Sequence, residues 1–297
     1  MMRSLTCIAT VALAATLVAG CATSPIAPST PSTPTTPPSS PSPQAVSQQF
    51  AGKSYVLLGE VHDNAAAQQQ RLQALSRAVE AGWRPAIAME QFDRERQPDI
   101  DRARRERPRD ANYLIAQAGS KAGWDWTLYQ PVVALALQYD LPLLAANLSR
   151  ADAAKIVRGG YGDVFAKDQQ AALGLDAALP ADIVTAQTAV LDAGHCGHFP
   201  KTMLPGMLSA QAARDAVMAQ TLRPYASRGA VLIAGNGHVR RDIGVPRWLW
   251  DAGNNSVLSV GYIETDSPAT GFDAVVRVPP RERDDPCKDA VMGKPMR

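Results

Sequence analysis

The stretch Tyr55-Val56-Leu57-Leu58-Gly59-Glu60-Val61-His62 decides the fold of this 297-residue chain. Its four leading apolar residues are short and unbroken enough to form a strand that is buried on both faces, and a glycine turn follows. The stretch Val231-Leu232-Ile233-Ala234-Gly235-Asn236-Gly237-His238 repeats this pattern. Because the carboxyl ends of strands form the ligand crevice of open α/β sheets, we expect Glu60, His62 and His238 to share one pocket.

A third apolar run, Ala86-Ile87-Ala88-Met89, ends at Glu90 and adds a carboxylate to this expected pocket. Carboxylates and imidazoles together serve general acid–base catalysis, or bind a divalent metal that activates water for hydrolysis. One hypothesis is therefore a hydrolase that uses Glu60, His62, Glu90 and His238 as catalytic residues. The alternative is structural, since a histidine after a strand is more often a surface or hydrogen-bonded residue. The serine-hydrolase elbow, the P-loop and the dinucleotide fingerprint do not occur in the sequence.

Strand and helix patterns alternate along the rest of the chain. Helical spacing covers 65–82, 112–118 and 129–139, and a third strand is predicted at 141–146. This alternation predicts an α/β fold with a mostly parallel sheet flanked by helices. From about 149 to 226 only helical spacing is found, which predicts a smaller helical insert. The sheet is expected to resume at 230–234, 257–262 and 274–278.

The N-terminus has the pattern of an export signal. Arg3 supplies a positive charge, residues 8–18 form a short apolar core, and Ala19-Gly20 precede Cys21 as in a bacterial lipobox. We therefore expect a lipoprotein signal peptide at 1–20, a lipid such as palmitate attached at Cys21, and a location outside the cytoplasm. Ala22, where an Asp is absent, favours the outer membrane over the inner membrane, with the body in the periplasm. An ordinary signal peptide with an incidental cysteine is the alternative.

Composition divides the remaining chain. Residues 21–47 are rich in Pro, Ser and Thr and cannot bury enough apolar surface to fold, so they predict a disordered linker. The α/β domain is expected at 48–280 and a polar tail at 281–297. The formal net charge of +2 excludes a strong field for nucleic acid. The arginines between 94 and 109 alternate with acids, which favours an ion-paired surface over an anion site.

Cysteine usage fits export. Once Cys7 leaves with the signal and Cys21 carries the lipid, Cys196 and Cys287 are the pair that remains in an oxidising compartment. We predict a disulfide between them, which the chain-entropy model credits with roughly 4–5 kcal/mol. Two free thiols are the alternative. A zinc site at His195, Cys196 and His198 is disfavoured because the usual paired ligand spacing is missing.

Several segments, in chain order, resemble the ChaN family of haem-binding lipoproteins. They include Gly59–Asp63, Met89–Asp93, the Gly123-Trp124 to Pro131 segment, the His195-Cys196 turn and Gly235–Pro246. The resemblance spans about residues 55–246. That family belongs to a wider group with Tiki-like and erythromycin-esterase-like proteins, which share glycine-x-x-histidine turns and an acidic residue. Both turns are present in this chain.

The resemblance implies a role in haem or iron uptake at the outer membrane. It implies that ferric haem is held between two protomers of a ligand-linked homodimer, and it allows an outer-membrane haem or iron receptor as a partner. In the family a tyrosine of one protomer ligates the iron, while histidine and lysine of the other bind the propionates. A phenolate is a hard anionic ligand that suits ferric iron. On this reading the protein binds haem and is not an enzyme.

Carried onto this chain, the family pattern selects Tyr129, with Tyr161 and Tyr113 as weaker candidates for the iron ligand. Tyr129 matches the family's Tyr-x-Pro segment and stands near Trp124 and Trp126. The alternative is a structural tyrosine that packs its ring and hydrogen-bonds its hydroxyl. For the propionates, the resemblance points to His195 or His198 with Lys201.

Overall fold

The computed structural model describes residues 40–120, 123–249, 253, 256–284 and 287–288. The predicted signal peptide, the lipidation site at Cys21 and the linker before residue 40 lie outside the described residues. In the part that is described, no helix has both the length and the apolar character needed to cross a membrane.

The core of the domain is a six-stranded sheet in which every strand pair is parallel. The strand order is β3-β2-β4-β1-β5-β6. The strands are β1 Tyr55–Leu58, β2 Ala86–Asp93, β3 Leu143–Asn147, β4 Ala230–Ile233, β5 Val257–Glu264 and β6 Ala274–Val278. The predicted α/β fold with a mostly parallel sheet flanked by helices is confirmed.

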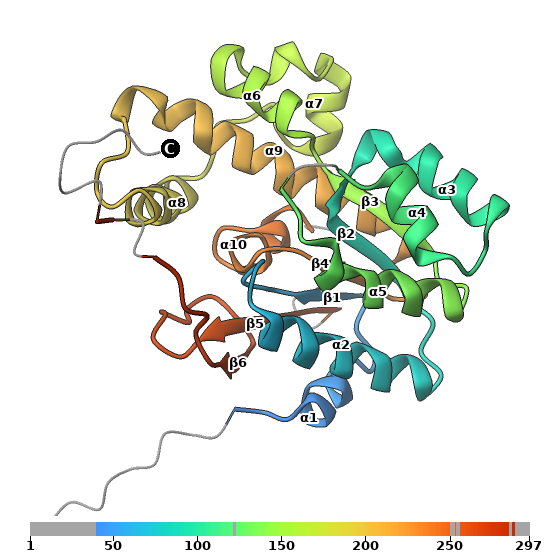
Figure 1. Ribbon diagram of the computed structural model, residues 1–297. Helices are drawn as coiled ribbons and strands as arrows, with labels where there is room; N and C mark the ends of the chain where they lie inside the picture. The colour runs from blue at the N-terminus through green and yellow to red at the C-terminus, as the bar shows by residue number, and fades with distance from the viewer. Residues whose placement is uncertain (1–39, 121–122, 250–252, 254–255, 285–286, 289–297) are drawn as a thin grey trace, which may run out of the picture. The chain divides into compact units, whose positions relative to one another are not determined.

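Helices from the first half of the described chain cover one face of the sheet (Figure 1). They are α1 Pro43–Gln48, α2 Ala65–Glu80, α3 Gln97–Glu106, α4 Ala111–Ala118 and α5 Trp126–Gln138. Side chains alternate along each strand, so Val56 and Leu58 face these helices while Tyr55 and Leu57 face the other layer. Both sets are buried, which explains why this run is apolar throughout.

The second layer contains α6 Arg150–Gly159, α7 Lys167–Leu173, α8 Ala181–Gly194 and α9 Leu204–Leu222. These four helices correspond to the predicted helical insert at about 149–226. They are also part of the main core, because Ala212, Ala216 and Ala219 of α9 are fully buried in one cluster with sheet residues. The short α10 Asn236–Val239 follows β4 directly.

Five 3-10 turns connect these elements in the described chain: η1 Arg94–Arg96, η2 Tyr161–Asp163, η3 Lys201–Met203, η4 Arg223–Tyr225 and η5 Val245–Trp248.

The ordered body begins earlier than the composition predicts, because α1 lies inside the segment assigned to the linker. Ser42 caps this helix by accepting from the backbone N–H of Ala45, and Pro43 occupies its first turn. Val46 is fully buried in the core, and α1 packs on α2. Proline content alone does not predict this helix, because a single apolar residue, Val46, anchors it to the core.

The polar tail after β6 is bound to the domain. Arg283 pairs with Asp63, which follows the first glycine turn, and with Glu264 at the end of β5. Further along, Cys287 forms a disulfide with Cys196, the residue after the C-cap of α8, with their Cα atoms 5.6 Å apart. The tail is therefore fastened both to the rim of the sheet and to the helical layer.

Candidate functional site

The strand order places three of the candidate stretches side by side. β4 lies between β1 and β2, so their carboxyl ends share one edge of the sheet. The structure brings Glu60, His62, Glu90 and His238 together there, and Asp215 of α9 joins them. We call these five residues the sheet-edge cluster.

Glu60 is a fully enclosed carboxylate that accepts hydrogen bonds from several side chains. Its Oε1 accepts from the Tyr129 hydroxyl at 2.7 Å and from Gln91 Nε2 at 3.0 Å. Its Oε2 accepts from Gln68 Nε2 at 3.1 Å and from the guanidinium of Arg71, which is also completely buried. A buried ion pair supported by this many donors holds Glu60 in one orientation.

The fixed carboxylate in turn orients His62. The Nδ1 of His62 lies 2.8 Å from Glu60 Oε1, and its side chain is 47% exposed. An imidazole that donates its Nδ1–H to a carboxylate keeps Nε2 as a lone-pair acceptor. Burial lowers the pKa of His62 and outweighs the neighbouring Glu90 carboxylate, which acts in the opposite direction. His62 is therefore neutral at pH 7.

A second pair, His238 and Asp215, faces the first. His238 Nδ1 lies 2.6 Å from Asp215 Oδ1, and its Nε2 lies 3.6 Å from Glu90 Oε1. Burial by itself lowers the pKa of His238, but Glu90 and Asp215 outweigh it and leave that pKa raised. Burial raises the pKa of Asp215 to about 6. Of the two histidines, His238 is therefore the one that keeps its proton to higher pH.

Sequence reasoning missed Asp215, which stands on a different element from the glycine turns. Its signal was present in the sequence, because it is the acid in the alanine-rich run of 210–219. A carboxylate that is 2% exposed on a core helix requires a partner. His238 is that partner.

Gly235 lies directly against the ring of His62 and beside Glu90. Its backbone N–H donates to Glu90 Oε2 at 2.8 Å. A β-carbon at this position would lie 3.0 Å from Cε1 and 3.1 Å from Nε2 of His62, so the glycine allows the ring to approach the backbone closely. The Nε2 edge of His62 therefore lies beside Glu90, on the side where His238 also points.

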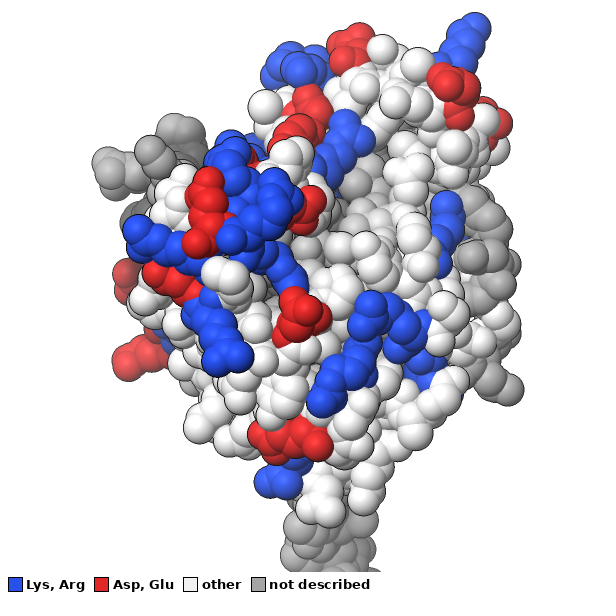
Figure 2. Space-filling view, turned by 90° about the vertical axis from the view of Figure 1, so that its right-hand side faces the viewer, with Lys and Arg blue, Asp and Glu red and all other residues white. Residues whose placement is uncertain are grey.

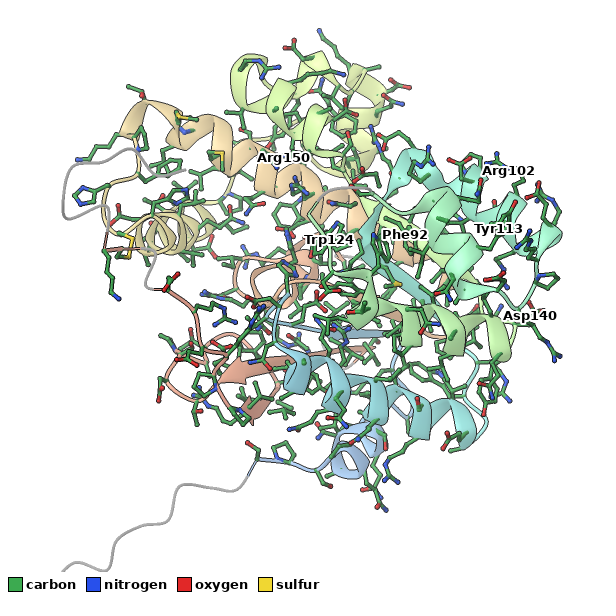
Figure 3. The ribbon with its side chains drawn as sticks, viewed as in Figure 1. Phe92, Arg102, Tyr113, Trp124, Asp140 and Arg150 are labelled. Carbon is green, nitrogen blue, oxygen red and sulfur yellow. A yellow bond between two sulfur atoms is a disulfide. The ribbon has the colours of Figure 1, made fainter. Side chains whose placement is uncertain are left out.

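Aromatic side chains border the cluster where α5 begins. Trp124 packs edge-on against His62, with ring centroids 4.9 Å apart, and it also packs against Tyr129. Phe92, at the end of β2, contacts Trp126 beside them; Phe92 and Trp124 are labelled in Figure 3. This wall shields one side of the cluster and leaves an apolar surface next to the accessible ring of His62.

A small cavity lies on the other side, between α8, α9 and α10. Its volume is about 50 Å³, and its lining residues are Gln187, Val190, Leu191, Gln211, Asp215, Gly237, His238 and Ile243. A water molecule occupies about 30 Å³ of the liquid, so the cavity accommodates a water or a small substituent. It is far too small for a porphyrin.

The predicted role of Tyr129 as an iron ligand does not agree with its position. Tyr129 is fully buried, and its hydroxyl is bonded to Glu60 and to the backbone oxygen of His62. Burial also raises its pKa, which disfavours the phenolate. Tyr129 has the structural role instead: Asp125 caps the start of α5, and Tyr129 is one of the buried residues of that helix.

The other predicted haem contacts lie away from Tyr129. His195 follows α8 and donates its Nδ1–H to the backbone oxygen of Leu191, while His198 and Lys201 are exposed. Helix α8 belongs to the layer on the opposite face of the sheet from α5 (Figure 1). One protomer therefore does not combine these three residues with Tyr129 in a single site.

The described residues contain no group of three or more His, Cys, Asp and Glu side chains with a geometry that could hold a metal ion. At the turn after α8, the Cys196 sulfur is engaged in the disulfide. The zinc reading of His195, Cys196 and His198 is thereby excluded, because a metal ligand must be a free thiolate.

The arginine-rich segment around α3 forms an ion-paired surface. Arg96 and Arg102 both pair with Asp99, at 2.8 and 2.7 Å, and Arg104 pairs with Asp140 at 2.7 Å. Figure 2 shows blue and red side chains interspersed on this face. Because carboxylates already pair with these arginines, we expect a solvated, ion-paired surface and not an anion-binding site.

Comparisons with known proteins agree with this architecture. The family model described as haem-binding uptake, Tiki superfamily, ChaN matches residues 46–249. Among solved structures, ChaN of Campylobacter jejuni with cofacially bound haem has 19% sequence identity and a TM-score of 0.63, over 78% of this chain and 90% of that one. No curated protein sequence matches the chain significantly.

Two further solved structures are less similar. A type III effector has 11% identity and a TM-score of 0.46, covering 81% of this chain and 94% of its own. A mutant of an erythromycin esterase in its open conformation has 13% identity and a TM-score of 0.40, covering 83% and 81%. The family match extends from α1 to the end of η5 and includes every residue of the sheet-edge cluster. The chain belongs to the ChaN family of haem-binding uptake proteins in the Tiki superfamily.

Proposed function

We propose that this protein binds haem as part of haem or iron uptake. The observation that carries the proposal is the family match across residues 46–249. The fold likeness to Campylobacter jejuni ChaN, a protein that binds haem cofacially, is in keeping with it.

The cavity beside His238, of about 50 Å³, cannot contain a porphyrin, so we place the haem outside the sheet-edge cluster. Within the described residues, the large apolar side chains that are exposed are Val190 of α8, at 42%, and Met203 of η3, at 46%. They flank, in sequence, the turn that carries His198 and Lys201, both exposed. Haem has apolar faces and anionic propionates, so this combination of apolar and cationic groups suits it.

We place the haem between two protomers, with His198, His195 and Lys201 of one protomer binding the propionates. The iron ligand from the other protomer is then Tyr113 or Tyr161. Both are partly exposed, whereas Tyr129 is buried. A phenolate from either residue would supply the oxygen ligand that ferric iron prefers, and the haem would link the dimer.

Hemin titration of the purified protein tests this proposal. We expect a saturable Soret shift and a change in oligomeric state from monomer to dimer, followed by absorption spectroscopy and light scattering. Tyr113→Phe and Tyr161→Phe identify the ligand, because only the true ligand changes the ferric spectrum. Lys201→Ala should weaken hemin binding several-fold. A wild-type protein that leaves the hemin spectrum unchanged refutes the proposal.

We further propose that the body is tethered to the outer membrane through a lipid on Cys21 and reaches into the periplasm. The sequence pattern before Cys21 supports this placement. Cells fed labelled palmitate should label the wild-type protein, and Cys21→Ser should remove the label and release the protein from the membrane fraction. Equal labelling of the two proteins would refute the anchor.

A further inference from the structure

The segment 192–203 runs from the last residues of α8 through η3, and we call it the bridged turn. None of its residues is buried, whereas Leu191 before it and Leu208 after it are. Its backbone hydrogen bonds are local, such as the one from the Gly197 N–H to the oxygen of Asp192 at 2.9 Å. Packing in the core therefore contributes little to holding this segment in one conformation.

The backbone of Cys196 adopts an unfavourable conformation within the bridged turn. Its φ is +58°, in the left-handed region that residues with a β-carbon rarely adopt. Among the described residues, Asp140 is the other non-glycine residue with a positive φ. A backbone in such a region persists where the surroundings enforce it, and the disulfide to Cys287 provides a covalent constraint at this residue. Opening the disulfide therefore allows the bridged turn to relax.

The tail, on the other side of the disulfide, has anchors of its own. Arg283 pairs with Asp63 and Glu264, and the backbone N–H of Arg281 donates to Glu264 Oε1 at 3.0 Å. These contacts do not involve Cys287, so they remain when the disulfide opens. The bridged turn is then the part that gains conformational freedom, while the tail stays on the rim of the sheet.

The disulfide lies where a reductant can reach it. Cys196 and Cys287 are both partly exposed, and their neighbours Gly197 and Lys288 are exposed. Thiol–disulfide exchange requires that a thiolate approach one of the two sulfur atoms, so partial exposure permits the reaction in the folded protein.

The bridged turn also carries the residues that we propose for the haem propionates, His195, His198 and Lys201. While the disulfide is closed, these side chains extend from a backbone that is fixed before haem arrives. Once it is open, binding must also order the backbone and the three side chains, and this cost lowers the affinity.

We propose that the Cys196–Cys287 disulfide is a site of thiol–disulfide exchange, at which a dithiol opens the bridged turn and weakens haem binding. This inference rests on the proposed haem function. A thiolate of the dithiol attacks one sulfur, the S–S bond breaks, and the other sulfur leaves as a thiolate and takes up a proton. The second thiol of the dithiol then displaces the first cysteine. The dithiol is oxidised to a disulfide, and Cys196 and Cys287 receive its two electrons and two protons.

Hemin titration of three forms of the protein tests the effect on affinity. They are the oxidised wild type, the wild type reduced and then desalted without oxygen, and Cys196→Ser/Cys287→Ser. Both open forms should bind hemin about 10-fold more weakly or worse than the oxidised protein, because three side chains must be ordered on binding. The double variant contains neither thiol, so it separates opening of the turn from ligation of iron by a thiolate.

Gln97→Ala is the matched control for loss of stability. It removes two hydrogen bonds to β3 from a helix of the other layer and leaves the disulfide intact. This variant should bind hemin as tightly as the oxidised wild type. Far-ultraviolet circular dichroism of each form shows that folded proteins are compared.

Thermodynamic linkage provides a second readout, because a ligand that prefers the closed disulfide must favour its closure by the same factor. The probe is gallium(III) protoporphyrin IX, which dithiols do not reduce. The protein is equilibrated with oxidised and reduced dithiothreitol, its thiols are alkylated, and mass spectrometry measures the ratio of closed to open protein. Saturating porphyrin should raise this ratio by the factor that separates the affinities of the two forms for the same porphyrin.

The outcomes separate this inference from the proposed function. An oxidised protein that binds no hemin refutes the haem proposal and this inference with it. Equal hemin binding by the oxidised protein and by Cys196→Ser/Cys287→Ser overturns this inference alone. It is also overturned if dithiothreitol reduces the disulfide only at urea concentrations that unfold the domain.

Discussion

Tyr129 illustrates how one side chain serves as a support for another. Its hydroxyl donates to Glu60, and Glu60 holds His62, so the tyrosine lies beneath the cluster rather than at its surface. The sequence marks the residue as notable without revealing which way its ring points. That direction depends on the packing of α5 against α2, a contact between segments far apart along the chain.

Tyr129→Phe should therefore leave the ferric haem spectrum unchanged and lower the free energy of unfolding. The loss should be about 1–3 kcal/mol, because the variant removes a buried hydrogen bond to a charged group. Urea unfolding measures it, with Tyr113→Phe as the control, since that hydroxyl lies on the outer side of α4 (Figure 3) and should change stability by less than about 0.5 kcal/mol. A changed haem spectrum in Tyr129→Phe would contradict this account.

At the residue scale, the convergence of Glu60, His62, Glu90 and His238 could be predicted because glycine turns after buried strands lead to one edge of a parallel sheet. Asp215 could not, since it comes from a helix in the opposite layer. The same limit applies to the donors around Glu60, which lie on β2, α2 and α5.

At the scale of single elements, β3 shows how an edge strand is protected. It has a paired neighbour on one side only, β2. Along its other side, Gln97 at the start of α3 donates to the backbone oxygen of Leu143 and accepts from the N–H of Ala145, at 3.1 and 2.7 Å. One side-chain amide thus imitates the peptide of a missing strand and blocks pairing with another chain.

Gln97→Ala should expose this edge. We expect the free energy of unfolding to fall by about 1–3 kcal/mol, because two backbone groups lose their partner, and self-association at high concentration to increase. Gln97→Glu keeps the acceptor for Ala145 and loses the donor to Leu143, so its loss should be intermediate. Urea unfolding and light scattering measure the two effects, and equal stability of all three proteins would show that solvent replaces the amide without cost.

The elements themselves could be predicted with differing success. β1, β4 and their turns follow from the apolar runs, and α8 follows from its spacing. α1 and α7 could not be predicted. α1 is a single turn or so in a proline-rich region, and α7 is a short, largely exposed helix with one buried anchor, Leu173, so neither has enough apolar periodicity to stand out.

At the scale of the whole domain, ion pairs fasten the C-terminal tail to the edge of the sheet. Arg283 holds Asp63 and Glu264, and this contact lowers the pKa of Glu264 to about 2. A carboxyl group with a depressed pKa stabilises the fold fully above its ordinary value near 4.5. That contribution is lost as the pH falls from about 5 towards 2.

Arg283→Ala should accordingly destabilise the protein by about 1–2 kcal/mol at pH 7, at the lower end for charged hydrogen bonds because the guanidinium is one-third exposed. The difference from wild type should shrink as the pH falls to 3. Urea midpoints at both pH values give the result, and Arg228→Ala, which removes an exposed arginine that contacts the backbone oxygen of Arg84, serves as the control. A difference that is constant with pH would contradict the assignment.

The disulfide joins Cys196 to Cys287 across 91 residues. Its removal in Cys196→Ser/Cys287→Ser should lower the free energy of unfolding by about 2–5 kcal/mol, since the open chain regains the entropy that the long loop had lost. Reducing the wild-type protein should give the same unfolding midpoint as the double variant. A reductant that further destabilises the double variant would point to a different thiol.

The position of this bridge also sets the sequence of events in biogenesis. Cys287 follows β4, β5 and β6, so the partner of Cys196 is added to the chain only after every strand of the described sheet has been synthesised. The bridge can therefore close only when all the described strands are present. A chain truncated before Cys287 should therefore fold, and added protease should cleave it faster than the full-length protein.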